Sequence, residues 1–113
     1  MLIIKNGYIS LTKGDTARIN VDIKSGANTK YVCVTGDTLE FSVKRSVTDS
    51  TYVFQKVITD FSDGVQIVIE PADTNSLSVG VYKYDIQLTL ANGDVHTIVP
   101  PNNFEVLSEV TTS

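Results

Sequence analysis

The chain has 113 residues, a formal net charge of −4 and an apolar content of 42%, which predict one domain with its own core rather than a disordered chain. This charge excludes the basic footprint of a nucleic-acid-binding protein and disfavours an anionic membrane surface as a partner. With a single cysteine, Cys33, the chain cannot form an internal disulfide, so packing alone must hold the fold.

The first residues, Met-Leu-Ile-Ile-Lys, lack the basic segment and the small-residue cleavage site of a secretory signal peptide. No apolar run approaches the roughly 20 residues of a membrane-spanning helix. We therefore expect a protein made in a cytoplasm, with residues 1–113 as a single domain. Residues 1–7 are expected to form an N-terminal arm or an edge strand, and residues 108–113 a frayed tail.

The first half of the chain predicts short strands separated by glycine-containing turns. Residues 8–11 are expected to follow the edge strand as a further strand, and a turn at residues 13–15 comes next. Apolar and polar residues then alternate from Ala17 to Ile23 and from Leu39 to Lys44, the pattern of half-buried strands. Residues 31–34 are expected to form a short strand or a loop filled with apolar side chains.

The next segment predicts two further strands and one short connection. Residues 52–58 are rich in residues that favour strands, although their alternation is irregular. Residues 65–70 alternate clearly, and Pro71 ends them because proline cannot donate to a strand ladder. The connection over residues 71–76 has room for one helical turn.

A hairpin over residues 76–99 shows the clearest pattern in the chain. Every second residue from Tyr82 to Leu90 is apolar, with polar residues between them. Asn92 and Gly93 then form the dipeptide typical of a type I′ hairpin turn, because both tolerate positive φ angles. We expect the second strand of the hairpin over residues 95–99.

The remaining residues complete a set of short strands. The segment from Pro100 to Asn103 is expected to bend the chain out of the sheet, and Phe104–Leu107 to form the last strand. The total is seven to nine short strands with turns about every 8–12 residues, which predicts an all-β, antiparallel β-sandwich.

Three residues near the start of the late strand suggest the kind of sandwich. Gly80, Tyr82 and Tyr84 follow one another at alternate positions. In immunoglobulin-type sandwiches, a tyrosine at this place bonds back to upstream backbone, an arrangement called the tyrosine corner, and the residue two positions later points into the core. We assign Tyr82 to the first role and Tyr84 to the second, and both roles are structural.

The sequence contains no convincing set of reactive residues. Cys33 is expected to be a small apolar strand residue, and its alternative role as a catalytic thiol would require a base, for which His96 is the only histidine. One histidine and one cysteine give no zinc pattern. Asp60, Asp63 and Gly64 indicate a turn rather than a calcium loop. We therefore expect no enzyme activity, no cofactor and no bound metal.

Carbohydrate-binding sandwiches usually present exposed aromatic side chains, and this chain has no tryptophan. Tyr82 and Tyr84 lie in phase with the core, which leaves Tyr8, Tyr31 and Tyr52 as candidates. For each of these three, burial in the core or at its rim is the expected outcome.

Short motifs of turn and core residues follow one another along the chain. They are Gly14-Asp15-Thr16, Thr35-Gly36 with Phe41-Ser42-Val43, Gly80–Asp85, the Asn92-Gly93 hairpin, Thr97–Pro100 and Phe104-Glu105-Val106. The order of these motifs resembles the N-terminal immunoglobulin-like domain of the baseplate upper proteins of tailed phages that infect Gram-positive hosts. The similarity covers Leu11 to Val106, almost the whole chain. Members of that family usually continue into further domains, whereas this sequence ends at Ser113.

The resemblance implies a non-enzymatic structural protein of a phage or prophage virion, in the tail or baseplate. Its expected partners are other virion proteins and further copies of the same chain. Its expected location is the virion, after synthesis in the bacterial cytoplasm without a signal peptide. Strand edges and the apolar residues Leu2, Ile3 and Ile4 are the expected assembly contacts. The alternative is a β-sandwich module that binds a carbohydrate or another host-surface ligand.

Overall fold

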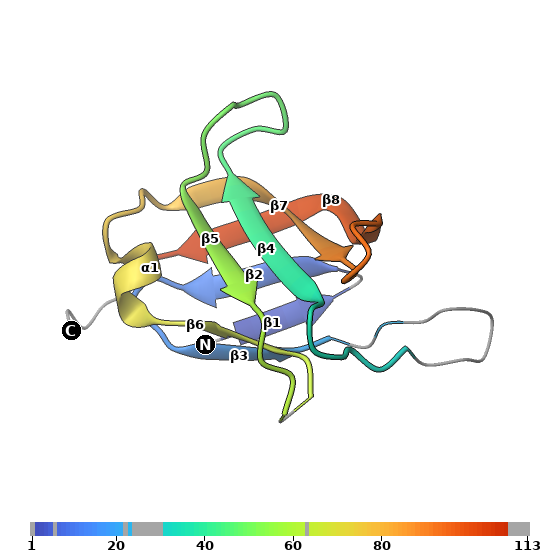
Figure 1. The fold of residues 1–113 in the computed structure, drawn as a ribbon. Coiled ribbons are helices and arrows are strands. Elements are labelled where there is room, and N and C mark those ends of the chain that lie inside the picture. The colour runs from blue at the N-terminus through green and yellow to red at the C-terminus, as the bar shows by residue number, and fades with distance from the viewer. Residues whose placement is uncertain (1, 6, 22, 24–30, 63, 109–113) are drawn as a thin grey trace.

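The computed structural model describes residues 2–5, 7–21, 23, 31–62 and 64–108, with side chains described from residue 7 onward. Nearly all of its regular structure is β (Figure 1). The elements are β1 (Leu2–Lys5), β2 (Tyr8–Thr12), β3 (Ala17–Asn20), β4 (Thr38–Lys44), β5 (Phe54–Ile58), β6 (Gln66–Ile69), α1 (Pro71–Asn75), β7 (Gly80–Thr89) and β8 (Val95–Leu107).

These strands form two sheets. Six of them pair in the order β1-β2-β8-β7-β4-β5, and β3 pairs with β6 in a second sheet of two strands (Figure 1). All neighbours are antiparallel except β2 and β8, which run parallel. The expectation of a purely antiparallel arrangement is therefore wrong at this pair. Parallel neighbours need a long connection, and nearly the whole chain separates β2 from β8.

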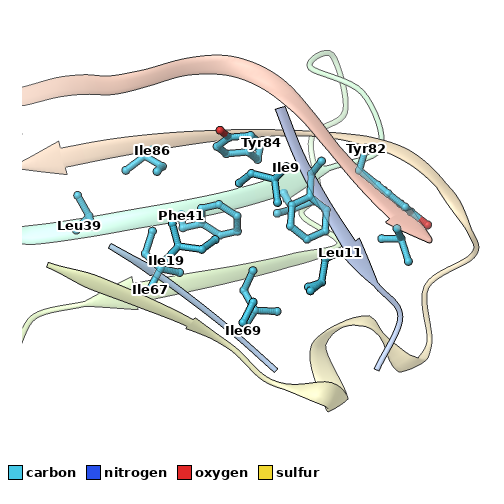
Figure 2. Close-up of a cluster of buried hydrophobic side chains, with 14 of the residues drawn as sticks. Ile9, Leu11, Ile19, Leu39, Phe41, Ile67, Ile69, Tyr82, Tyr84 and Ile86 are labelled. Carbon is cyan, nitrogen blue, oxygen red and sulfur yellow. The ribbon is translucent and has the colours of Figure 1, made fainter. Parts of the chain in front are cut away.

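Buried apolar side chains from both sheets form one cluster, which Figure 2 shows in close-up. Ile19, Ile67 and Ile69 of the two-stranded sheet join residues of the larger sheet in it. Phe41 is fully buried, and its ring centroid lies 5.3 Å from that of Tyr84 and 6.1 Å from that of Phe104. The alternating positions of the sequence therefore face this shared core, as predicted.

The last strand is longer than the sequence suggests. β8 runs without interruption from Val95 to Leu107, although Pro100 to Asn103 were expected to leave the sheet. The register between β7 and β8 shifts around Asp85, so Pro100 and Pro101 together lie opposite this one residue. Such a bulge tolerates prolines because its extra residue is not required to donate to the ladder.

The strand predicted from Ala17 to Ile23 is shorter than expected, and residues 31–34 are not part of a strand. β3 ends at Asn20 rather than at Ile23, because its partner β6 begins only at Gln66. Beyond this point the Val21 N–H still donates to the Val65 carbonyl oxygen at 2.9 Å. Residues 31–34 form a loop, which is the second of the two expected alternatives. Tyr31 packs against the core, whereas Val32 and Val34 are exposed. Cys33 is buried in this loop, so its predicted packing role is confirmed while a position on a strand is not.

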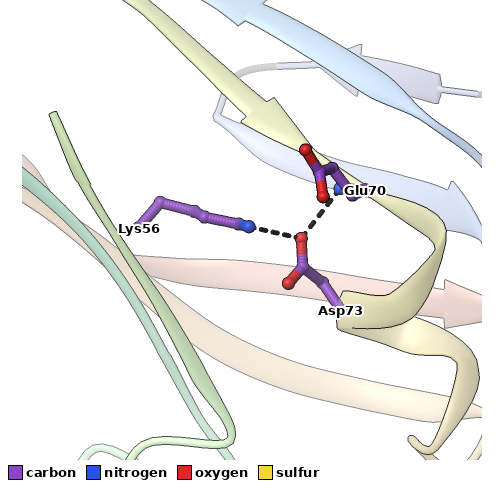
Figure 3. Close-up of polar contacts among 3 residues, drawn as sticks. All are labelled: Lys56, Glu70 and Asp73. Carbon is purple, nitrogen blue, oxygen red and sulfur yellow. Dashed lines mark hydrogen bonds and ion pairs between the residues drawn. The ribbon is translucent and has the colours of Figure 1, made fainter. Parts of the chain in front are cut away.

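The short helix α1 closes the connection between the two sheets. Pro71 occupies its first turn, where a missing N–H has no cost, and the Asp73 carboxylate accepts the Glu70 N–H at 2.8 Å. Asp73 also pairs with Lys56 of β5 at 2.7 Å (Figure 3). The hydroxyl oxygen of the buried Thr74 accepts the Gly14 N–H at 2.9 Å. These bonds tie α1 to β5 and to the turn between β2 and β3.

No helix in the described part of the chain is long and apolar enough to cross a membrane.

Candidate functional site

The tyrosine corner is formed by the start of β7. The Tyr82 side chain is 4% exposed, and its hydroxyl donates to the Ser78 carbonyl oxygen at 2.7 Å. The bond spans four residues and fastens the loop that leads into β7. It is the bond back to the upstream backbone that the sequence predicts. Gly80 opens the strand between these two residues.

Tyr84 lies two positions further along the same face and points into the core, as expected. Its ring packs on Phe41, and its hydroxyl donates to the carbonyl oxygen of Gly7. Burial raises the pKa of the Tyr84 hydroxyl above its usual value. This tyrosine therefore links the core to the turn between β1 and β2.

The hairpin turn between β7 and β8 differs from the predicted type I′ turn. The Gly93 N–H donates to the Leu90 carbonyl oxygen, and the Leu90 N–H donates to the backbone carbonyl oxygen of Asp94, both at 2.8 Å. Ala91 and Asn92 therefore occupy the centre of the turn, and Gly93 follows it with a φ of 95°. This is the three-residue hairpin loop in which only one residue needs positive φ.

The predicted assembly segment is an edge strand. β1 contains Leu2, Ile3 and Ile4, and it pairs antiparallel with β2 at one end of the six-stranded sheet. The side chains of these three residues lie outside the described part of the structure.

The residues weighed for catalysis do not form a reactive group. Cys33 is buried and unpaired, and burial is the main cause of its raised thiol pKa. A raised pKa disfavours the reactive thiolate. His96 is an exposed residue of β8. Among the described residues, no three metal-ligating side chains come together.

A polar groove of about 180 Å³ lies on the outer face of the six-stranded sheet, and we call it the outer-face groove. Its polar residues alternate with core residues along β4 and β7, so they point away from the core. Glu40 faces Gln87, Ser42 faces Asp85, and Lys44 faces Lys83 across the two strands. Its remaining lining residues are Val47, Tyr52, Tyr84 and Pro101.

Asp85 is the most distinctive residue of the outer-face groove. It lies at the bulge where β8 places two prolines opposite it. Partial burial raises the pKa of its carboxyl group, while the nearby Lys44 charge lowers it. No hydrogen-bond donor of the described residues contacts this carboxylate, whereas Glu40 accepts from the Gln55 amide at 3.3 Å.

Two aromatic residues, Tyr52 and Tyr84, line this groove. Tyr52 is 50% exposed, and the Lys44 ammonium lies 5.1 Å from the centre of its ring. Tyr8 and Tyr31 are partly buried. The expectation of burial is therefore wrong for Tyr52, which the loop between β4 and β5 holds at the edge of the sheet.

A second, apolar groove of about 500 Å³ lies beside β8. Leu88, Leu90 and Ile98 contribute to its wall, and His96 lies at its rim. β2 pairs only with the end of β8 from Phe104 onward, so the outer edge of β8 before this residue has no strand partner among the described residues. Three residues of this segment of β8, His96, Thr97 and Ile98, line the groove.

One buried polar residue, Asp37, is not recognisable from its local sequence. Asp37 is 2% exposed, and its carboxylate accepts the Tyr31 hydroxyl at 2.6 Å. It also accepts the backbone N–H groups of Val34 and Ala91. An aspartate beside glycine is ordinary turn chemistry, so no local signal distinguishes this residue.

Comparisons with protein-family models, curated proteins and solved structures found no match for this chain.

Proposed function

We propose that this chain is an immunoglobulin-like β-sandwich that serves as a non-enzymatic structural component of a phage or prophage virion, in the tail or baseplate. The strand order supports the fold class. β8, β7 and β4 are neighbours, as the G, F and C strands of immunoglobulin domains are, and β3 pairs with β6 as B pairs with E. The tyrosine corner at Tyr82 lies at the start of the F-like strand.

The resemblance to baseplate upper proteins supports the virion role. The residues of its motifs lie in the core and in the turns, where structural motifs are expected. Phe41 and Val43 lie in the core, as do Phe104 and Val106 near the end of β8. The Gly14 backbone N–H is held by Thr74. These residues stabilise the fold, so the motifs that carry the resemblance have structural roles.

The observation that carries the proposal is the position of β1. This apolar strand is the outermost strand of the six-stranded sheet, and its far edge has no partner among the described residues. Unpaired strand edges bind further strands by backbone hydrogen bonds. We propose that β1 docks against a further copy of this chain or another virion protein during assembly, and that the protein resides in the virion.

Light scattering over a concentration series tests assembly through β1. We expect the full chain to form a discrete oligomer that dissociates when Met1–Lys5 are deleted or when Ile3→Lys places a charge on β1. Val57→Lys is the matched control, because it adds the same charge to β5 at the opposite edge of the sheet. A monomer at every concentration, or an oligomer that none of the β1 variants weakens, would contradict assembly through β1.

The virion assignment has a separate test. After prophage induction in the organism that encodes the chain, density-purified particles should contain the protein in a constant ratio to the other tail proteins. Particles that lack the protein would overturn the assignment. Detection in the particles would support it independently of the oligomeric state in solution.

The alternative, a carbohydrate- or host-surface-binding module, predicts at least two exposed coplanar aromatic rings. Of its three candidates, Tyr52 is half exposed while Tyr8 and Tyr31 are partly buried. The condition that would exclude this alternative, burial of all three rings, is not met. Because only one of the three rings is exposed, they do not form an extended aromatic platform, and this alternative ranks second.

A further inference from the structure

We infer that the outer-face groove is a binding site for a single uncharged sugar ring. This inference goes beyond the proposed assembly role, because the groove lies on the face of β4 and β7 rather than at the edge formed by β1. It rests on the size of the groove, its balance of charges, one carboxylate that accepts no hydrogen bond from the described residues, and one apolar side.

The size of the groove suits one ring rather than a longer chain. Its volume is about 180 Å³, below the roughly 300–1,000 Å³ of sites that enclose drug-sized ligands. The groove follows two paired strands, so its floor is a regular sheet rather than a loop. Sites built on regular elements hold their side chains in a defined geometry.

The charges of the groove favour an uncharged ligand. Lys44 and Lys83 provide two cations, and Glu40 and Asp85 provide two anions, so the lining has no formal net charge. A strongly anionic or cationic ligand would meet as much repulsion as attraction. A ring carrying several hydroxyl groups can donate to the carboxylates and accept from the ammonium groups at the same time.

Asp85 is the best placed acceptor in the groove. Glu40 already accepts from Gln55, and Lys83 donates to the side-chain oxygen of Asn103. The Asp85 carboxylate has no donor among the described residues, although it is partly removed from water. Hydroxyl groups that donate to a carboxylate form short, strong hydrogen bonds. A hydroxyl group of the ligand would therefore supply the donor that Asp85 lacks among the described residues.

The remaining side of the groove is apolar. Tyr52, Val47 and Pro101 contribute to it, and Tyr52 and Val47 are each about half exposed. A pyranose ring has C–H groups that can pack against such surfaces while its hydroxyl groups reach polar residues. The Lys44 ammonium beside the Tyr52 ring joins the apolar side to the charged side.

A titration followed by ¹H–¹⁵N NMR tests the inference on the full chain. The probes are methyl α-glucopyranoside, methyl α-galactopyranoside and N-acetylglucosamine, with glucuronate and glucosamine as charged counterparts. We expect at least one neutral sugar to shift the amide signals of Lys44, Tyr52 and Asp85 with a millimolar dissociation constant. Asp85→Asn should weaken this binding about tenfold or more, while Val57→Ala on neighbouring β5 should not change it.

Asp85→Asn separates binding from folding. The Asp85 side chain is partly exposed and accepts no hydrogen bond from the described residues, so an amide of the same shape should leave the fold intact, which urea unfolding measures. The inference is overturned if no neutral sugar shifts these signals, if a charged counterpart binds more tightly, or if Asp85→Asn binds as well as the native chain. None of these outcomes bears on assembly through β1, which the oligomeric state measures.

Discussion

The Asp37 carboxylate accepts a hydrogen bond from the Ala91 backbone N–H at 3.2 Å, across 54 residues of sequence. The same carboxylate accepts the Tyr31 hydroxyl and the Val34 N–H. Asp37 therefore fastens the loop before β4 to the turn between β7 and β8. A buried carboxylate is stable here because each oxygen has at least one donor.

Asp37→Asn should destabilise the fold at neutral pH, because an amide turns its NH₂ group toward at least one of these donors. The Tyr31 hydroxyl, followed by the backbone N–H groups, lowers the pKa of Asp37 below 3.8. Its stabilisation is therefore complete above pH 3.8 and is lost as the pH falls through the lower, folded-state pKa. Urea unfolding at several pH values measures both effects.

Asp49→Asn is the matched control for this acid dependence, since no described residue donates a hydrogen bond to the Asp49 side chain. We expect the urea midpoint of Asp37→Asn to be lower than that of Asp49→Asn at neutral pH, and the difference to shrink in acid. Equal midpoints at neutral pH would show that the Asp37 contacts do not stabilise the fold.

The hydrogen bond from the Tyr31 hydroxyl to the Asp37 carboxylate predicts that the fold loses stability in alkali. Its hydrogen bond to Asp37 raises the pKa of Tyr31 to about 12, from 10.0. The neutral phenol therefore stabilises the fold fully below pH 10.0, and this contribution is lost as the pH rises toward the folded-state value. Tyr31→Phe should be less stable at neutral pH and should lack this part of the alkaline dependence. An unchanged alkaline dependence in Tyr31→Phe would contradict the assignment.

Tyr82→Phe should lower the free energy of unfolding by about 1 kcal/mol, the usual net value of one hydrogen bond. The change removes only the hydroxyl that donates to Ser78 and keeps the buried ring. Urea unfolding measures the difference, and Tyr52→Phe is the control because its ring is half exposed. If both variants lose the same free energy, the tyrosine corner makes no specific contribution.

Gly36→Ala should cost more stability than Gly93→Ala. Both glycines have positive φ, 100° and 95°, so each alanine meets backbone strain of about 1–2 kcal/mol. A Cβ at Gly36 would also lie 2.8 Å from the Cβ of Ala91, whereas one at Gly93 would have no atom within 4 Å. Thermal unfolding of the two variants gives the comparison. Equal losses would show that the turn at Ala91 moves aside without cost.

The ion pair between Lys56 and Asp73 should contribute little, although it joins β5 to α1 (Figure 3). A double-mutant cycle with Lys56→Met and Asp73→Asn should give a coupling free energy of at most about 1 kcal/mol, and less in high salt. The cycle is needed because Asp73 also accepts the Glu70 N–H. A larger coupling that salt does not reduce would indicate a pair shielded from solvent.

The candidate sugar site shows where prediction from sequence stops. Tyr52 could be selected from the sequence as one of three free aromatic residues, but its exposure depends on the loop that carries it. Asp85 lies on a strand that was predicted correctly, where it is one polar residue among several. Its special environment comes from Pro100 and Pro101, which lie opposite it only because β8 continues through the bulge.

Local alternation in the sequence by itself determined that this protein is built of β-strands, and which face of β4 and β7 meets the core. Successive side chains of a strand point to opposite sides, so this information is contained in neighbouring residues. Tertiary structure alone decided the parallel pairing of β2 with β8, the continuous course of β8 and the contacts of Asp37. Each of these depends on backbone groups far apart in the chain, which pair according to the free edges that the folded sheets present.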